Sequence, residues 1–418
     1  MFFYTACFYS VLPWIFLRLL WRSRQQSGYR KNWAERLGYC PFKLKACIWV
    51  HVVSMGETIA AAPLIRALKQ AYPQWPVVIT NMTPTGRAQV VKLFGEDTLK
   101  CYIPYDIPFA VNTFLNRIQP KIAIILETEL WPNTILACAR RKIPLLILNA
   151  RLSEKSQRGY QRILPLTKKI LSAITHIGAQ ASYDADRFVT LGLPVDKITV
   201  TGNLKFDLVL PNIEIQTLHK NFGLRSHIWI AASTHPGEED IILEAHREIL
   251  KKYPEALLIL VPRHPDRFPS VFSNVQASGF SVIKRSQRLN CEDNIQVYLG
   301  DTMGELLYMY AVSQVAFIGG SLIERGGHNM LEAAALKKPV LSGPSVYNFT
   351  EVSQLLLQAG GMQIVTNTKA LVASILNFFD HPDIQKNTGE KAYQVFIQNK
   401  GALEKQLKLI KDFLQMMS

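Results

Sequence analysis

Residues 47–72 read CIWVHVVSMGETIAAAPLIRALKQAY and combine two hydrophobic patterns. The first part, residues 47–54, is a short run rich in Val and Ile, which is typical of a buried strand. After Gly56, which permits a turn, residues 58–72 repeat apolar side chains at the spacing of an amphipathic helix. The stretch therefore predicts one strand followed by one helix, the unit from which parallel sheets are built.

The same unit recurs along the first half of the chain. Further short apolar runs alternate with amphipathic stretches such as residues 133–142. The runs lie at residues 76–82, 100–106, 121–129, 144–150, 176–180 and 198–203. Repeated strand and helix predict a parallel sheet that is covered by helices on both faces.

The pattern restarts in the second half, after an irregular stretch over residues 208–225 that we interpret as a linker. A helix is predicted over residues 238–252, among new apolar runs. These runs lie at residues 229–234, 257–263, 281–285, 295–300, 315–321, 339–343 and 362–365. The sequence therefore predicts an α/β fold of two doubly wound, Rossmann-like domains. Such sheets bind ligands beyond the carboxyl ends of their strands, which predicts an interdomain cleft as the site.

The composition is that of an ordinary globular protein with an excess of positive charge. Of 418 residues, 48% are hydrophobic and 19% are charged, which excludes wholesale disorder. The 47 Lys and Arg exceed the 32 Asp and Glu, and the net charge of +15 implies an anionic partner such as nucleic acid, acidic lipid or a phosphorylated substrate. Six cysteines without a CxxC pair exclude a disulfide scaffold and predict reduced thiols rather than a zinc site.

The basic residues gather behind an apolar N-terminal run. Residues 1–17 carry no charge, and residues 18–45 then hold eight Lys or Arg against one acidic residue, Glu35. A cleaved signal peptide has its positive charge before the apolar run, so we expect a membrane anchor over residues 1–21 instead. We favour a single-pass spanning helix, which needs about 20 apolar residues, over a helix that lies in the membrane surface. Either one places the basic cluster on the cytoplasmic side, and a membrane explains this charge more simply than nucleic acid does.

In the first half, charged side chains follow the predicted strands. Glu57 falls in the first helical turn after residues 47–54, where it is a candidate general base, with stabilisation of the helix dipole as the alternative. Glu127 and Glu129 end the fourth predicted strand, residues 121–129, and point the same way if that strand continues, with a solvated turn as the alternative. Arg87 begins another helix, where anion binding and a role in helix capping are both open.

In the second half, small and basic residues follow two strands. Ser233 and Thr234 precede a helix whose free N–H groups suit a phosphate. Arg263, with His264 beside it, follows the next strand and is a natural partner for that phosphate. The sequence contains neither G-x-G-x-x-G nor a Walker lysine, which disfavours a dinucleotide site and a P-loop.

A glycine-rich loop follows the run at residues 315–321. Two glycine pairs, at residues 319–320 and 326–327, predict backbone N–H groups that close on a phosphate, and a plain loop is the alternative. We expect the first turn of the next helix to carry Asn329 and, soon after, Glu332. A carboxylate at that position is a candidate ligand of a ribose diol.

Seven motifs, in order along the chain, carry a resemblance to a known family. They are WVHVVSMGE (49–57), ETELWPN (127–133), NARLS (149–153), GNLKFD (202–207), PRHPDRF (262–268), GDTMGEL (300–306) and GGHNMLEAAA (326–335). From Arg30 to its end, and in its N-terminal anchor, the chain resembles the 3-deoxy-D-manno-octulosonic acid (Kdo) transferases of Gram-negative bacteria.

The resemblance implies a GT-B fold and a metal-independent reaction without a cofactor. Kdo passes from CMP-Kdo to a lipid A precursor, with inversion at the anomeric carbon, on the cytoplasmic face of the inner membrane. The basic N-terminus suits this acceptor and the anionic lipids around it. We expect an anchor over residues 1–21, an acceptor domain over residues 22–210, a CMP-Kdo-binding domain over residues 211–384 and C-terminal helices over residues 385–418, the last of which crosses back to the first domain.

The resemblance also implies roles for single residues. Glu57 matches the proposed catalytic base, and since a helix N-terminus lowers the pKa of a carboxylate, we expect a weak base that is nevertheless well placed. We assign Glu127, Glu129 and Arg87 an acceptor-side or supporting role. The matching donor-binding positions are Ser233, Thr234, Arg263, His264, Gly327, His328, Asn329 and Glu332.

Three other functions are compatible with parts of the pattern. A GT-B transferase that uses another nucleotide sugar is the nearest, although the PRH and GGHNMLE motifs disfavour it. A nucleotide-sugar epimerase shares the fold but needs no membrane anchor. A membrane-tethered binding module without activity predicts that Glu57 is dispensable.

Overall fold

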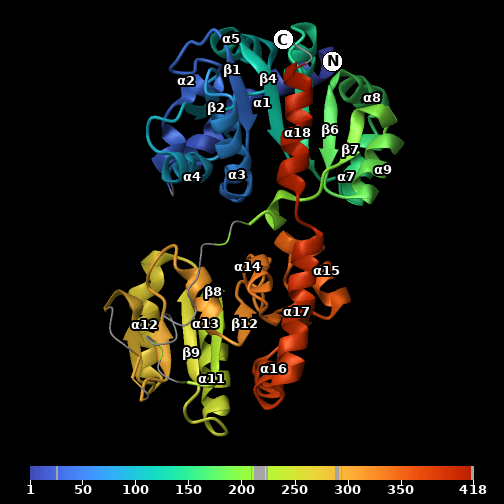
Figure 1. The fold of residues 1–418 in the computed structure, drawn as a ribbon. Helices are drawn as coiled ribbons and strands as arrows, with labels where there is room; N and C mark the ends of the chain where they lie inside the picture. Colours follow the sequence, from blue (N-terminus) through green and yellow to red (C-terminus); the bar gives the residue numbers. More distant parts are fainter. Residues whose placement is uncertain are drawn as a thin grey trace. The chain divides into compact units, whose positions relative to one another are not determined.

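The computed structural model describes residues 1–24, 27–208, 210, 222, 225–287, 291–292 and 294–415. The chain forms two units, of which unit 1 comprises Met1–Asp207 with Lys400–Ser418 and unit 2 comprises Leu208–Asn399. Figure 1 shows that each unit is built on a sheet with helices on both faces. The predicted linker over residues 208–225 lies almost entirely outside the described residues.

Unit 1 contains a seven-stranded parallel sheet in the order β3-β2-β1-β4-β5-β6-β7. Its strands are β1 (Cys47–His51), β2 (Val77–Asn81), β3 (Lys100–Tyr102), β4 (Pro120–Leu126), β5 (Leu145–Ala150), β6 (His176–Ala179) and β7 (Ile198–Val200). Every run predicted as a strand forms one. The strands end earlier than predicted where polar residues follow, because those residues leave the ladder and turn toward the next helix.

The strand order creates a switch point between β1 and β4. From β1 the chain builds outward to β3, then returns and builds β4 to β7 on the other side of β1. The loops that follow β1 and β4 therefore leave the sheet in opposite directions, and the space between them is where ligands bind in such folds. Glu57 follows β1 and Glu127 follows β4, so the order of the strands brings the two positions to this point.

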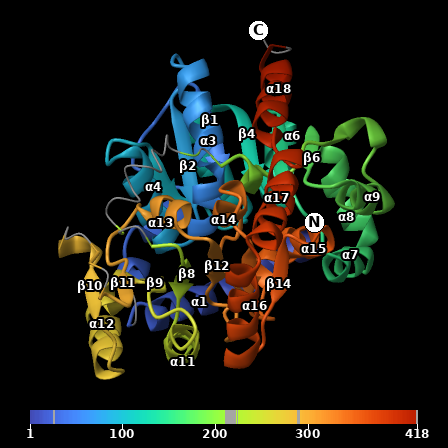
Figure 2. The same ribbon diagram turned by 60° about the horizontal axis from the view of Figure 1, so that its bottom comes forward.

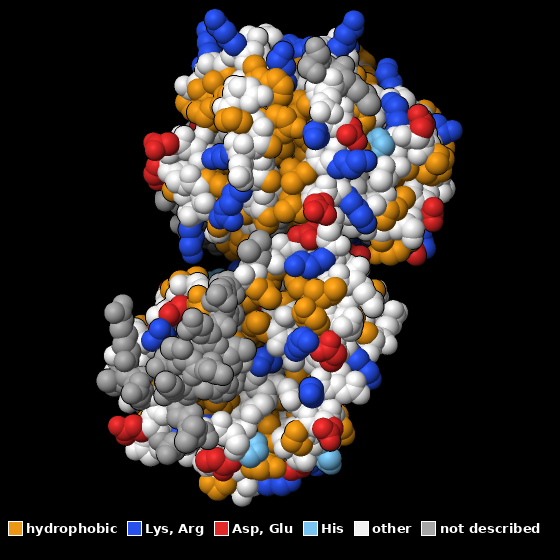
Figure 3. All heavy atoms as spheres, in the orientation of Figure 1, with side chains coloured by type: hydrophobic (Ala, Val, Ile, Leu, Met, Phe, Trp, Pro, Cys, Tyr) orange, Lys and Arg blue, Asp and Glu red, His pale blue; other side chains and the backbone are white. Residues whose placement is uncertain are grey.

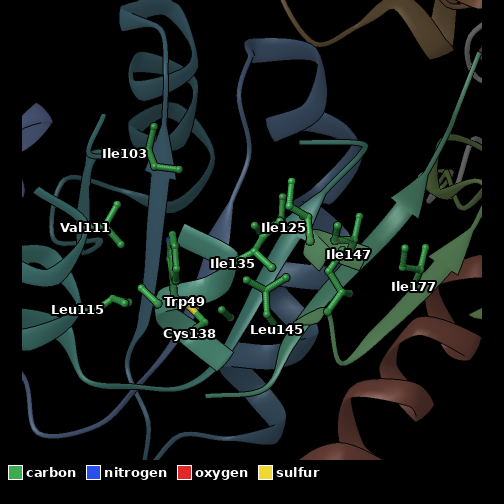
Figure 4. Close-up of a cluster of buried hydrophobic side chains, with 14 of the residues drawn as sticks. Trp49, Ile103, Val111, Leu115, Ile125, Ile135, Cys138, Leu145, Ile147 and Ile177 are labelled. Atoms are coloured by element: carbon green, nitrogen blue, oxygen red, sulfur yellow. The ribbon is translucent and has the colours of Figure 1, made fainter. Parts of the chain in front are cut away.

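Two apolar clusters bury the sheet of unit 1, one on each face. Trp49 of β1 is fully buried and stacks edge to face on Phe114, at 5.1 Å between ring centroids. Figure 4 shows Trp49, Ile125, Ile147 and Ile177, from four strands of the sheet, within one apolar cluster.

The helices of unit 1 are α1 (Phe2–Arg22), α2 (Trp33–Arg36), α3 (Met55–Ala71), α4 (Pro84–Phe94), α5 (Pro108–Ile118), α6 (Pro132–Arg140), α7 (Glu154–Gln161), α8 (Leu164–Ala173), α9 (Ser182–Thr190) and α18 (Ala402–Gln415).

One side of helix α1 lies against the rest of unit 1. Tyr4 donates its hydroxyl hydrogen to Asp106 at 3.1 Å, and the ring of Phe16 meets Tyr105 edge to face. Among the described residues, α1 is the one helix that is long and apolar enough to cross a membrane, judged by length and composition. Its other side exposes large apolar side chains, namely Phe2, Phe3, Tyr9, Val11, Trp14, Leu17, Leu20 and Trp21.

Unit 2 repeats the same architecture. Its seven parallel strands are β8 (Ile228–Thr234), β9 (Leu257–Pro262), β10 (Val282–Lys284), β11 (Val297–Leu299), β12 (Val315–Ile318), β13 (Val340–Ser342) and β14 (Met362–Ile364). They lie in the order β10-β11-β9-β8-β12-β13-β14, and Figure 2 shows them running from β10 on the left to β14 on the right. The switch point of this sheet therefore lies between β8 and β12.

The helices of unit 2 cover both faces of this sheet. They are α11 (Glu238–Leu250), α12 (Phe268–Ala277), α13 (Leu306–Val312), α14 (Leu331–Ala335), α15 (Thr350–Ala359), α16 (Thr368–Asp380) and α17 (Pro382–Gln398). The chain then returns to unit 1, where Asp207 accepts hydrogen bonds from the backbone N–H groups of Gly401 (2.7 Å) and Leu403 (2.6 Å). This carboxylate fixes the start of α18, which packs on α3.

Figure 3 shows Lys and Arg side chains on the surfaces of both units, so the positive charge extends beyond the N-terminal cluster.

Candidate active site

In unit 1, Glu57 is held by a capping box at the start of α3. Ser54 is the N-cap residue, and its hydroxyl accepts from the N–H of Glu57 and donates to one Glu57 carboxylate oxygen at 2.9 Å. The other carboxylate oxygen accepts from the N–H of Val53 at 2.7 Å. The Ser-x-x-Glu pattern encodes this arrangement locally, because each side chain satisfies a backbone or hydroxyl donor of the other. The carboxylate is therefore fixed at the carboxyl end of β1.

The surroundings of Glu57 make it a stronger base than the sequence predicts. Burial and then the negative charge of Glu127 raise its pKa from 4.5 to about 7, against the opposing hydrogen bonds of Val53 and Ser54. The expectation of a lowered pKa is wrong, because desolvation of the carboxylate outweighs the helix N-terminus. A carboxylate with a pKa close to neutral pH is suited to accept a proton from a hydroxyl group.

Glu127 and Glu129 lie near Glu57, but they belong to the loop after β4 and do not continue the strand as predicted. Strand β4 ends at Leu126, and Glu127 has a positive φ of 59°. Such a conformation is unusual for a residue other than glycine and tends to occur at functional sites. The charges of both residues raise the pKa of Glu57, and burial followed by the charge of Glu127 raises the pKa of Glu129. The structure therefore gathers three carboxylates at the switch point of the sheet.

Arg87 is engaged elsewhere in unit 1. Its guanidinium forms an ion pair with the buried carboxylate of Glu35 at 2.6 Å. Glu35 also accepts from the backbone N–H of Tyr102 at 2.8 Å, so it holds Arg87 beside β3. An acceptor-side role for Arg87 remains a prediction.

In unit 2, Ser233 and Thr234 lie at the end of β8 and not in the loop after it. Ser233 has a positive φ of 59°, and the register of β8 with β9 shifts there. The N–H of Arg263 donates to the carbonyl of Thr234 at 3.0 Å, so Arg263 follows directly on the paired strands. A side chain at position 319 would place its Cβ 2.7 Å from the carbonyl oxygen of Ser233, which explains why this residue is a glycine.

Glu238 is a key residue that the sequence did not single out. This fully buried carboxylate accepts four backbone N–H groups, those of His235, Gly320, Ser321 and Leu322, at distances of 2.7 to 3.0 Å. The prediction that the N–H groups of the two glycine pairs bind a phosphate is wrong, because all four groups donate within the protein. Gly320 donates to Glu238, Gly326 to the hydroxyl of Ser345 (3.0 Å), and Gly319 and Gly327 to the carbonyls of Ala232 and Gly320 (both 2.8 Å). An acid in the first turn of α11 was the available signal, but three of its four partners lie more than 80 residues away along the chain.

Three histidines and an arginine surround the carboxyl ends of β8, β9 and β12. The Nε2 atoms of His235 and His328 are 2.8 Å apart, so one ring donates and the other accepts. The ring of His264 meets His235 edge to face, at 5.4 Å between centroids. Burial, followed by the charge of Arg263, lowers the pKa of His328 to about 3, which keeps this imidazole neutral. His235 was not predicted, and its partner lies 93 residues away along the chain.

This cluster has the charge that an anion requires. Arg267 is paired with Glu239 at 2.7 Å, whereas the ion pairs of the described residues do not include Arg263. The charges of Arg267 and Arg325 also act on His235, and each helps to lower its pKa after burial and His264. The cluster can therefore hold a phosphate through side chains.

Asn329 and Glu332 lie together at the start of α14. Because α14 begins at Leu331, Asn329 precedes the helix and is not in its first turn as predicted. Its side-chain oxygen accepts from the N–H of Leu331 at 3.1 Å, and its amide donates to Glu332 at 3.2 Å. Burial raises the pKa of Glu332. Gly327 has a φ of 70° in the loop before them, which only glycine adopts without strain.

Apart from Arg87, which pairs with Glu35, the structure thus brings the predicted residues together within each unit. Unit 1 gathers the carboxylates, and unit 2 gathers the basic and histidine side chains next to Glu332. Among the described residues, no group of three or more His, Cys, Asp or Glu side chains is arranged to hold a metal ion.

Comparisons with known proteins place the chain in a family. A family model described as 3-Deoxy-D-manno-octulosonic-acid transferase (kdotransferase) matches residues 31–208, and a model of Glycosyl transferases group 1 matches residues 227–395. A 3-deoxy-D-manno-octulosonic acid transferase of Haemophilus influenzae is 41% identical and covers 99% of both chains. The protein of the same name from Bordetella pertussis is 33% identical and covers 98% of this chain and 99% of its own.

Solved structures at lower identity share the fold. UDP-GlcNAc 2-epimerase from Neisseria meningitidis is 18% identical, with a TM-score of 0.57 over 87% of this chain and 100% of its own. A glycosyltransferase from Rickettsia africae is 17% identical, with a TM-score of 0.55 over 89% of this chain and 99% of its own. These likenesses confirm the predicted pair of Rossmann-like domains. With full-length relatives above 30% identity, the chain belongs to the 3-deoxy-D-manno-octulosonic acid (Kdo) transferases, which are glycosyltransferases.

Proposed function

We propose that this Kdo transferase takes Kdo from CMP-Kdo and attaches it to a sugar hydroxyl of a bisphosphorylated lipid A precursor, lipid IVA. The observation that carries the proposal is the carboxylate of Glu57, which is fixed by Ser54 and Val53 and has a pKa raised to about 7. A base with this pKa is matched to a reaction near neutral pH.

On the donor side, unit 2 suits a nucleoside monophosphate ester. Arg263 supplies positive charge for the phosphate, and the neutral ring of His328 lies beside it. The positive charge of Arg263 acts on the buried carboxylate of Glu332. This carboxylate is the candidate ligand for the ribose hydroxyls. Side-chain cations can neutralise the charge that develops on the leaving phosphate, so this mechanism does not require a metal ion.

On the acceptor side, Glu57 takes the proton from the attacking hydroxyl group. The hydroxyl oxygen forms a bond with the anomeric carbon of Kdo as the bond from that carbon to the CMP phosphate oxygen breaks. The electron pair of the broken bond leaves with CMP, and one such displacement inverts the configuration. Glu127 and Glu129 support the reaction by keeping the pKa of Glu57 high.

For the membrane, the contacts of α1 favour a helix that lies in the surface. Contacts with unit 1 extend from Tyr4 to Phe16, which is about 18 Å of helix at 1.5 Å per residue. The part of α1 that remains free is too short to cross a hydrocarbon core of about 30 Å. We therefore replace the spanning helix favoured above with an interfacial one that places the body of the protein on the cytoplasmic face of the inner membrane, next to anionic lipids.

A transfer assay tests the proposed reaction. Purified protein in detergent receives CMP-Kdo and lipid IVA, with EDTA in one arm and a UDP-sugar in place of CMP-Kdo in another. We expect mass increments of Kdo in the lipid with and without EDTA, and none with the UDP-sugar. Glu57→Gln, which keeps the size of the side chain, is expected to lower the rate by at least about 10²-fold.

Glu96→Gln is the matched control, since the side chain of Glu96 is 80% exposed. A wild-type protein that releases no CMP and modifies no lipid would rule out the proposed donor and acceptor. A Glu57→Gln variant with wild-type activity would leave the family standing but remove Glu57 as the base.

A further inference from the structure

The buried carboxylate of Asp106 collects hydrogen bonds from two separate helices. Asp106 follows β3 and is 2% exposed. One of its oxygens accepts from the N–H (2.8 Å) and the hydroxyl (2.7 Å) of Thr134, and the other accepts from the N–H of Asn133 (2.9 Å). The second oxygen also accepts from the hydroxyl of Tyr4 in α1 at 3.1 Å.

These contacts supply the cap that α6 lacks in its own sequence. The N-cap residue of α6 is Trp131, whose side chain makes no capping hydrogen bond. The first N–H groups of a helix have no partner within it, and a negative charge there is favourable. Asp106 provides both the acceptors and the charge, although it lies 27 residues before Asn133.

The start of α6 is also the end of the loop that carries the carboxylates. Pro132 opens α6, three residues after Glu129 and five after Glu127. The other end of this loop is held by β4, where the N–H of Glu127 donates to Leu148 at 2.9 Å. The loop is therefore held at both ends, at one by the sheet and at the other by Asp106.

We propose that Asp106 is a positioning residue that holds Glu127 and Glu129 beside Glu57, and that Tyr4 of α1 is part of this support. The anchor helix then contributes to the acceptor side of the active site as well as to the membrane. A second contact agrees with this arrangement, because the hydroxyl of Thr5 donates to the side-chain oxygen of Asn133 at 3.3 Å. The inference rests on the proposed function for its effect on the rate, but not for its effect on Glu57.

The test measures the titration of Glu57 in the full-length protein, by NMR of carboxyl-labelled glutamate, together with the pH dependence of Kdo transfer. Glu127 and Glu129 are the charged groups that raise the pKa of Glu57. If the loop that carries Glu127 and Glu129 moves away from Glu57, the midpoint of the Glu57 titration must fall. We expect Asp106→Asn to lower the midpoint by at least about half a unit and kcat by about tenfold, with KM for CMP-Kdo unchanged. Tyr4→Phe should act in the same direction with a smaller effect, of about threefold in kcat.

Tyr9→Phe is the control, because Tyr9 lies on the same helix and is 45% exposed. It should match the wild type. Variants that only lose thermal stability, with the Glu57 midpoint unmoved, would overturn the inference. If Asp106→Asn does not fold, Tyr4→Phe decides alone, since it removes a single oxygen. Should the wild type transfer no Kdo, the proposed function fails, while the NMR titration still judges the role of Asp106.

Discussion

At the residue scale, the carboxyl end of β1 shows how burial sets the chemistry of a side chain. Glu57 is positioned by a local capping box, yet its pKa is raised by desolvation and by Glu127. Glu238 shows the opposite use of a buried acid in unit 2. It accepts four backbone N–H groups and so shapes the glycine turn after β12. Glu57 is therefore available to accept a proton, whereas Glu238 stabilises the backbone around it.

The raised pKa of Glu57 predicts a cost in stability at high pH. Because the folded pKa, about 7, exceeds the ordinary 4.5, the group favours the folded state below pH 4.5 and loses this contribution as pH rises through 7. Glu57→Gln does not titrate, so we expect its free energy of unfolding, relative to wild type, to increase by about 1–2 kcal/mol between pH 5 and pH 8. Urea denaturation at the two pH values measures this difference. Glu96→Gln should show none, and a flat difference for Glu57→Gln would contradict the raised pKa.

At the element scale, two helices of unit 1 are capped by residues from elsewhere in the chain. The first N–H groups of α6 are bound by Asp106, and the N–H groups around the start of α18 are bound by Asp207. Asp207 is the last residue of unit 1 before unit 2, and Gly401 follows the return of the chain. The GNLKFD motif (202–207) therefore serves the attachment of the C-terminal helix.

Loss of the Asp207 cap should loosen α18. We expect Asp207→Ala to lower the free energy of unfolding by about 1–2 kcal/mol, because two backbone donors lose their acceptor. Hydrogen exchange measured by mass spectrometry should become faster over residues 401–415 before other parts of unit 1. Asp412→Ala, which changes a 44% exposed side chain of the same helix, is the control. Unchanged exchange in α18 would show that packing of its apolar face on α3 is sufficient.

At the scale of the whole molecule, two similar sheets carry different chemistry. Both are parallel, seven-stranded and have one switch point. Unit 1 places carboxylates there and adds an apolar helix, whereas unit 2 places Arg263 and the histidines there. The division agrees with the proposed function, in which unit 2 binds a water-soluble, negatively charged donor and unit 1 binds a lipid acceptor. The net charge of +15 is consistent with binding to an anionic bilayer.

The exposed face of α1 should determine membrane binding. Trp14 lies at its centre and is 72% exposed. We expect Trp14→Glu to reduce flotation with vesicles of anionic phospholipid by about tenfold, because it replaces an interfacial aromatic ring with a negative charge. Val195→Glu, at a position that is 71% exposed and far along the chain from α1, should float like the wild type. Equal loss in both variants would point to charge alone, and no loss in Trp14→Glu would remove α1 from the interface.

The sequence by itself determined the strands, the helices that follow them and the family, because the strands and helices depend on local hydrophobic patterns and the family on short motifs. The Ser54–Glu57 capping box belongs to the same class. Only the tertiary structure decided the pKa of Glu57, the contact between His235 and His328, and the capture of the Gly320 N–H by Glu238. These features join residues that are far apart in the chain or depend on burial, and neither distance nor burial exists until the sheets are assembled.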